Sequence, residues 1–323
     1  MSLFSVKVPP QYDKAERLDK YIASLPNGMN RSKLKSGVTE ILVNGKKSKL
    51  SQKICAGDLI DISWEDNIPD NIEPENIPLD IIYEDENVTV VNKAQGMVTH
   101  PACGNWSGTL VNALLYHWGR EAVKQIKEGS EQKIMEFRRP GIVHRLDKET
   151  SGIIITAKNR DVEEFLGQQF RQKTLKKEYI LIVKGRPPAV AGDIRTQIIR
   201  DPKDRKRFKA VTDTDEGKYA RTIYHCIASY GNYTLVRVRL KTGRTHQIRV
   251  HMKYLGCPIV GDSIYNKVDP IFPDATLMLH SKLLQITLPG EQKPHTFITP
   301  TPKRFLELEK KLKQMYNKKE FTE

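Results

Sequence analysis

The chain has 323 residues, of which 28% are charged and 38% hydrophobic, and this composition suits a globular protein of about two domains. No apolar run approaches the roughly 18 residues of a membrane span, and the first residues lack the apolar core of a signal peptide. We therefore expect a cytoplasmic protein without a membrane partner. A formal net charge of +14 favours a polyanion such as nucleic acid as the partner.

Residues 14–63 are predicted to form a small separate domain. Two apolar stripes at helical spacing indicate two helices, formed by Leu18, Ile22 and Leu25 and by Leu34, Val38 and Ile41. Asn44-Gly45 is typical of a hairpin turn, and an alternating strand begins at Leu59. Basic side chains in this segment are candidate contacts for a phosphate backbone: Arg31, Lys33, Lys35, Lys46 and Lys47.

Residues 64–78 are acidic, contain proline and show no periodicity, which indicates a linker. Residues 79–323 are expected to form the second domain. Near its start we predict the strand Val88–Asn92 and, after a glycine-rich loop, a helix capped by Thr109. The highly charged residues 119–138 are interpreted as a surface insertion.

A polar loop then lies between two short β-branched runs, residues 141–143 and 153–155, which are expected to be strands. The loop carries the carboxylate of Asp147. Three side chains that can be cationic flank it in the sequence: His144, Arg145 and Lys148. Nearby cations favour the ionised form of a carboxylate, which can then act as a base or a nucleophile.

The rest of the chain alternates between predicted helices and strands. Strands are expected at Lys177–Val183, Thr196–Ile199, Ala220–Cys226, Tyr233–Leu240 and Leu277–Leu284. Apolar spacing predicts three helices: one from Asp161 with Val162, Phe165, Leu166 and Phe170 inward, one with Ile248, Met252 and Leu255, and one over Pro300–Tyr316 with Phe305, Leu306 and Leu308.

Residues 200–209 form a dense basic segment between two of these strands. One interpretation is an arm that grips RNA phosphates through Arg205, Lys206 and Arg207, with Phe208 stacking on a base. A solvated charged turn fits the segment equally well.

Two strings in the second domain resemble motifs of a known enzyme family. HRLDKETSG, residues 144–152, resembles the catalytic motif of the RluA/RluD-type pseudouridine synthases, and GRTHQIRVH, residues 243–251, resembles the last catalytic motif of that family. Residues 14–63 are similar to the alpha-L RNA-binding domain, which is shared with a ribosomal small-subunit protein. The resemblance covers nearly the whole chain.

The resemblance implies an α+β fold in which a mixed, mostly antiparallel sheet carries the active-site cleft. It also implies the isomerisation of uridine to pseudouridine within RNA. Every bond broken or made is then internal to the RNA, so no cofactor and no metal are expected. The sequence offers no phosphate-cradling glycine loop and no cluster with metal-ligand spacing. We expect a monomeric enzyme.

Roles for individual residues follow from the same resemblance. Asp147 attacks the anomeric carbon or removes a proton from the neighbouring ribose carbon, and the sequence leaves both routes open. Arg249 is its expected ion-pair partner, and Tyr179 is expected to pack against the target base. Arg145 fills the space that the base vacates when it leaves its helix.

Large-subunit (23S) ribosomal RNA is the expected substrate, because an alpha-L domain joined to this catalytic domain suits such enzymes. Transfer RNA is the alternative target. An RNA glycosylase would need a second carboxylate, for which Glu149 is the nearby candidate. A non-catalytic ribosome-binding factor is a further alternative, and the intact strings at 144–152 and 243–251 argue against it.

Overall fold

A computed structural model of the protein describes residues 2–25, 29, 34, 38–64, 71–102, 104–124, 140–204, 206–212 and 214–321. The chain divides into two compact units, Met1–Pro69 and Asp70–Glu323, and each is described by itself. The predicted contacts of Arg31, Lys33, Lys35 and Arg205, and most of the expected insertion at 119–138, fall outside the described residues.

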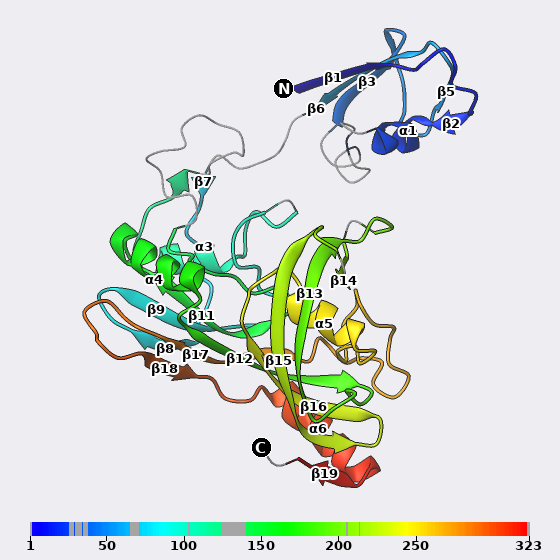
Figure 1. Ribbon diagram of the computed structural model, residues 1–323. Coiled ribbons are helices and arrows are strands. Elements are labelled where there is room, and N and C mark those ends of the chain that lie inside the picture. The colour runs from blue at the N-terminus through cyan, green and yellow to red at the C-terminus, as the bar shows by residue number, and fades with distance from the viewer. Residues whose placement is uncertain are drawn as a thin grey trace. The chain divides into compact units, whose positions relative to one another are not determined.

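The N-terminal unit contains a small antiparallel sheet and the helix α1 (Leu18–Ser24), drawn in blue in Figure 1. The sheet has the order β1-β6-β3-β4, with β1 at Ser2–Lys7, β6 at Leu59–Trp64, β3 at Val38–Val43 and β4 at Lys46–Lys47. A second pair joins β2 (Glu16–Arg17) to β5 (Lys53–Ile54). Leu18 and Ile22 of α1 lie in one core cluster with Ile60 and Ile62 of β6.

The turn between β3 and β4 confirms the hairpin expected at Asn44-Gly45. Both residues have a positive φ, 53° and 74°, as two-residue hairpin turns of this sequence require. The helix expected to run through Val38 and Ile41 is wrong over these residues, because they belong to strand β3, which pairs with β6. Pairing with a neighbouring strand has overridden an apolar spacing that also fits a helix. The sheet also begins before residue 14, since β1 pairs with β6 along its length.

The second half of the expected linker, residues 64–78, is part of the C-terminal unit. There β7 (Asn71–Ile72) pairs with β10 (Val123–Lys124). Farther along, the Asn112 side chain donates a hydrogen bond to the carbonyl oxygen of Glu73 at 2.7 Å. These hydrogen bonds tie residues 71–73 to the C-terminal unit.

The C-terminal unit is built on an eleven-stranded sheet (Figure 1). The strand order is β14-β13-β15-β16-β12-β17-β11-β9-β8, with β18 beside β17 and β19 beside β15. Strands β11 and β17 run parallel and the other pairs are antiparallel, which confirms the predicted α+β class with a mixed, mostly antiparallel sheet. The strands are β8 (Ile81–Glu84), β9 (Val88–Lys93), β11 (Ser151–Ala157), β12 (Lys176–Lys184), β13 (Ala191–Arg200), β14 (Phe208–Val211), β15 (Lys218–Tyr230), β16 (Tyr233–Leu240), β17 (Leu279–Ile286), β18 (His295–Ile298) and β19 (Lys318–Glu320).

The helices of this unit are α3 (Leu110–His117), α4 (Arg160–Gln172), α5 (Gln247–Tyr254) and α6 (Lys303–Met315). The Thr109 side chain caps α3 as predicted, since it accepts from the backbone of Asn112 while the Asn112 side chain accepts in return. Two apolar side chains expected to face inward do not. Phe165 of α4 is 38% exposed and Leu306 of α6 is 53% exposed, because each lies at the edge of its helix's apolar stripe.

Candidate active site

Asp147 lies in the loop that leads into strand β11. At Gly152, the second residue of that strand, a Cβ atom would lie 2.2 Å from the carbonyl oxygen of Ser281 on β17, so the close parallel approach of β11 and β17 requires glycine. The run before the loop is not the predicted strand, because Ile142 forms only an isolated bridge with Thr156.

His144 and Lys148, which flank Asp147 in the sequence, have other partners. Nε2 of His144 accepts a hydrogen bond from the backbone N–H of Ile155 at 3.0 Å, and burial lowers the pKa of this imidazole to about 3. The ring is therefore uncharged at neutral pH. Nζ of Lys148 donates to the Asn105 side chain at 3.2 Å. The expectation that these two residues supply cations to the carboxylate is wrong.

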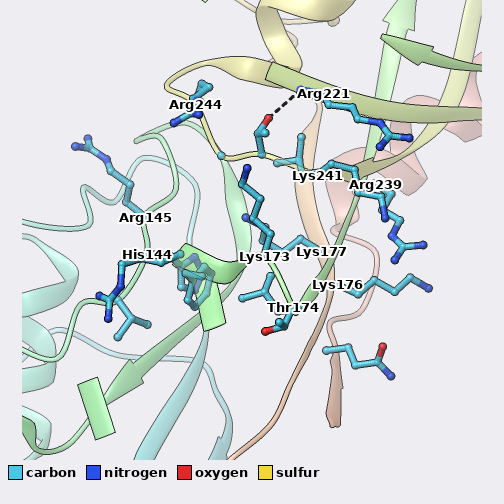
Figure 2. Close-up of a pocket in the computed structure, with 18 of the residues that line it drawn as sticks. His144, Arg145, Lys173, Thr174, Lys176, Lys177, Arg221, Arg239, Lys241 and Arg244 are labelled. Atoms are coloured by element: carbon cyan, nitrogen blue, oxygen red, sulfur yellow. Dashed lines mark hydrogen bonds between the residues drawn. The ribbon is translucent and has the colours of Figure 1, made fainter. Parts of the chain in front are cut away.

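The described residues among the predicted RNA contacts lie at the surface. Arg145 is exposed and lines a wide pocket rich in basic side chains (Figure 2). Lys46 and Lys47 form the exposed strand β4 of the N-terminal unit. Lys206 and Arg207 lie in the connection between β13 and β14. All five are open to solvent, and their RNA contacts stay predictions.

Helix α5 supplies the strongest cationic contact of Asp147. Nη1 of Arg249 lies 3.3 Å from Oδ2 of Asp147. The same guanidinium makes a closer, bidentate pair with Asp262, with Nε at 2.8 Å and Nη2 at 2.7 Å from the two carboxylate oxygens. Burial would lower the pKa of Arg249, but pairing with Asp262 and Asp147 outweighs it and raises the pKa, so the side chain stays charged. The expected contact exists, and a second carboxylate holds the arginine in place.

Asp262 was not singled out from the sequence, although a signal for it exists. Arg249 is 4% exposed and Asp262 is 2% exposed. A buried guanidinium requires a partner, and Asp262 stands 13 residues downstream, in the continuation of the same motif string. The sequence alone does not show that Arg249 and Asp262 form a pair, because the fold brings them together.

His246 also faces Asp147 and was likewise not predicted. It occupies the residue before α5 in a left-handed conformation, with a φ of 55°, and its Nε2 lies 3.8 Å from Oδ2 of Asp147. Nδ1 lies 2.8 Å from the hydroxyl of Tyr265, which accepts a hydrogen bond from the backbone N–H of Phe208. Burial lowers the pKa of His246 more than the charge of Asp147 raises it. A neutral imidazole ring therefore faces the carboxylate.

Phe208 is packed rather than free. Its ring lies edge-on to His246 at 5.8 Å between centroids, and the Arg200 guanidinium lies 5.1 Å from the ring centroid. These contacts hold the ring in place beside His246, and its stacking on a base stays a prediction.

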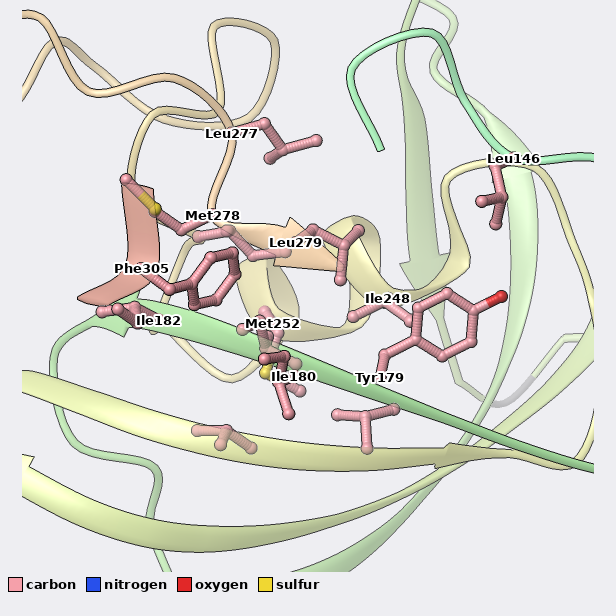
Figure 3. Packing of buried hydrophobic residues seen from close by; sticks show 14 of the residues in the cluster. Leu146, Tyr179, Ile180, Ile182, Ile248, Met252, Leu277, Met278, Leu279 and Phe305 are labelled. Carbon is pink, nitrogen blue, oxygen red and sulfur yellow. The ribbon is translucent and has the colours of Figure 1, made fainter. Parts of the chain in front are cut away.

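Tyr179 of strand β12 lies at the edge of the hydrophobic core, beside Ile248 of α5 (Figure 3). Its hydroxyl points away from the packed side chains around Met252. Tyr179 is 6% exposed, and burial raises the pKa of its hydroxyl to about 12 against the opposing hydrogen bond from Ser281. The phenol is therefore protonated at neutral pH and can donate a hydrogen bond.

The fold thus brings together the three residues predicted to be catalytic, from a loop, a strand and a helix. Asp147, Tyr179 and Arg249 line one small pocket of about 60 Å³. Asp147 is the carboxylate of that lining, and its side chain is 23% exposed.

The comparisons with known proteins agree with this geometry. The family model described as RNA pseudouridylate synthase matches residues 87–254, which contain both the Asp147 loop and helix α5. The chain belongs to this family. It is an RNA pseudouridine synthase of the RluA/RluD type, an isomerase that acts on RNA, as the motif strings indicated.

Two relatives and one solved structure illustrate the match. The ribosomal large subunit pseudouridine synthase D of Borreliella burgdorferi is 45% identical over 91% of this chain and 89% of its own. The protein of the same description from Zymomonas mobilis is 38% identical over 78% of this chain and 77% of its own. The structure of human RNA Pseudouridylate Synthase Domain Containing 1 covers 76% of this chain and 91% of its own, with a TM-score of 0.57 and 23% identity, and supports the fold.

No three His, Cys, Asp or Glu side chains among the described residues gather closely enough to hold a metal ion. No helix in the described ranges has the length and apolarity to cross a membrane.

Proposed function

We propose that this pseudouridine synthase modifies specific uridines of large-subunit ribosomal RNA in the cytoplasm, with Asp147 as the residue that acts on the ribose. The observation that carries the assignment is the setting of Asp147: a partly exposed carboxylate in the lining of the pocket, 3.3 Å from a buried guanidinium that is itself fixed by Asp262. An ionised, aimed carboxylate can attack the anomeric carbon or remove the adjacent ribose proton.

The other residues of the pocket are proposed to serve this step. Arg249 orients the Asp147 carboxylate, because its planar guanidinium is anchored on the far side by Asp262. Tyr179 presents its ring to the uracil, and its protonated hydroxyl can hydrogen-bond to the turning base. Arg145 occupies the gap left in the RNA when the target nucleotide turns out.

The glycosylase alternative is less well supported. A glycosylase would need a second carboxylate to activate water beside the ribose. Glu149, its candidate, is not part of the pocket lining, which contains Asp147 as its acidic residue.

The proposed target rests on the relatives and on the N-terminal unit. Two relatives are described as synthases of the ribosomal large subunit. The exposed Lys46 and Lys47 of the N-terminal hairpin are suited to a phosphate backbone, as is expected of an alpha-L RNA-binding domain.

The test is a pseudouridine map of total RNA from cells that lack the gene, complemented with the wild type or with Asp147→Asn. We expect particular sites in large-subunit ribosomal RNA to lose pseudouridine and to regain it with the wild type only. If pseudouridine is lost only from transfer RNA, the substrate is transfer RNA and not large-subunit ribosomal RNA. Restoration by Asp147→Asn would contradict the role of Asp147.

A further inference from the structure

A second and much larger cavity of about 770 Å³ lies beside the Asp147 pocket, and we call it the basic groove. One side is formed by Arg171 and residues 173–177, from the end of α4 to the first residues of β12. The other side is formed by Arg221 and residues 239–244 at the end of β16 (Figure 2). Nine of the lining residues are lysine or arginine, and none of the described lining residues is aspartate or glutamate. The basic groove therefore attracts anions electrostatically along its whole length.

Among the described residues, several of these cations form no ion pair with a carboxylate. Within the part of the chain that the structure describes, Arg171, Lys176 and Arg221 pair with carboxylates, whereas Lys177, Arg239 and Lys241 are in no ion pair. Burial lowers the pKa of Lys177 to about 8. Burial and repulsion from Arg239 and Arg221 also lower the pKa of Lys241. Arg239 is exposed and Lys177 and Lys241 are partly exposed. Like charges held close together repel one another, and such clusters are expected where an anionic ligand neutralises them.

The basic groove is continuous with the Asp147 pocket. Leu240 and Arg244 line both cavities, and Arg145 of the groove stands two residues before Asp147. A strand of RNA whose target nucleotide sits at Asp147 therefore has its neighbouring nucleotides at the entrance of the groove. Tyr219 also lines the groove and is 45% exposed, which offers an aromatic face to an unpaired base.

We propose that the basic groove binds the single-stranded RNA that flanks the target uridine, with Lys177, Arg239 and Lys241 on its phosphates and Tyr219 stacked on a flanking base. This inference rests on the proposed function, because the RNA strand reaches the groove from the Asp147 pocket. RNA binding is then divided between two sites. The Asp147 pocket binds the target nucleotide, and the basic groove binds the RNA strand next to it.

The phosphate contacts are tested with the full-length double variant Arg239→Gln plus Lys241→Gln. The matched control is Lys310→Gln plus Lys311→Gln, which removes the same charge from exposed positions on α6. Binding of a single-stranded RNA oligomer of mixed sequence, about 12 nucleotides long, is followed by fluorescence anisotropy at several salt concentrations. Each lost phosphate contact reduces the slope of log K against log salt by about 0.7, so the groove variant should lose about 1.4 and the control should match the wild type.

Tyr219→Ala provides an independent readout. Removing the ring should weaken binding about tenfold without changing the salt slope, because stacking releases no counterions. A groove variant with the affinity and slope of the wild type, or an equal change in the α6 control, would overturn the proposal. Turnover plays no part in this assay, so its failure leaves the role of Asp147 standing. Absence of pseudouridine formation by the wild type would instead refute the proposed function.

Discussion

Asp262 provides a direct test of how Arg249 is held. Its carboxylate contacts the guanidinium at 2.8 and 2.7 Å, and both residues are almost fully buried. Asp262→Asn keeps the size of the side chain but leaves the buried guanidinium without its bidentate partner. Removing one member of a buried ion pair costs about 3–5 kcal/mol of unfolding free energy. Because Arg249 keeps its contact with Asp147, we expect the lower end, about 3 kcal/mol.

This loss should depend on pH in a defined direction. Burial raises the pKa of Asp262, but pairing with Arg249 outweighs it, so the folded pKa lies below the ordinary value. A carboxyl group with a depressed folded pKa contributes its stability above the unfolded pKa, about 3.9, and loses it as the pH falls through the folded pKa. The difference between wild type and variant should be complete at neutral pH and should shrink below about pH 4.

Urea-induced unfolding followed by circular dichroism measures this difference. The matched control is Asp193→Asn, which removes a carboxylate paired with Arg195 and Arg221 at a side chain that is 30% exposed. Surface pairs contribute less than about 1 kcal/mol, so the control should unfold almost like the wild type. If Asp262→Asn also stays within about 1 kcal/mol of the wild type, the pair with Asp262 does not anchor Arg249.

Three further predictions concern the active site and the N-terminal unit. Arg249→Lys should restore little of the turnover lost in Arg249→Ala, because a lysine cannot bridge Asp147 and Asp262 with a planar fork; near-normal single-turnover rates would contradict this. Tyr179→Phe should bind RNA normally but turn over more slowly, since the ring remains and the hydroxyl is lost, and full activity would limit Tyr179 to packing. Deleting residues 1–69 should leave a folded enzyme with weaker RNA binding and a flatter salt dependence, measured by anisotropy, and unchanged binding would refute an RNA-binding role for this unit.

Features set by local chemistry could be predicted from the sequence. The cap at Thr109 and the hairpin at Asn44-Gly45 depend on a few neighbouring residues, and both are confirmed. The spacing of apolar residues did not distinguish a helix from a strand in every segment. Val38 and Ile41 fit a helix by spacing, yet pairing with β6 makes them a strand, because a long-range partner outweighs local preference.

Only some residues of the active site could be predicted from the sequence. The motif strings led to Asp147 and Arg249, which the fold does bring into contact. His246 lies within the string at 243–251 and Asp262 lies in its continuation, but only the fold shows that they contact Asp147 and Arg249. Closeness in the sequence is also misleading at Lys148. It is adjacent to Asp147 in the chain, but its side chain donates a hydrogen bond to Asn105.

Single-turnover conversion of unmodified large-subunit ribosomal RNA by Asp147→Asn measures whether the reaction requires the carboxylate of Asp147. Asparagine keeps the shape and much of the hydrogen bonding of Asp147 but can act neither as nucleophile nor as base. Glu149→Gln is the matched control, since it removes the neighbouring carboxylate of the same loop. We expect Asp147→Asn to bind the RNA as tightly as the wild type or slightly more tightly and to form no pseudouridine, while Glu149→Gln stays active. Measurable pseudouridine formation by Asp147→Asn would show that catalysis does not require the carboxylate of Asp147.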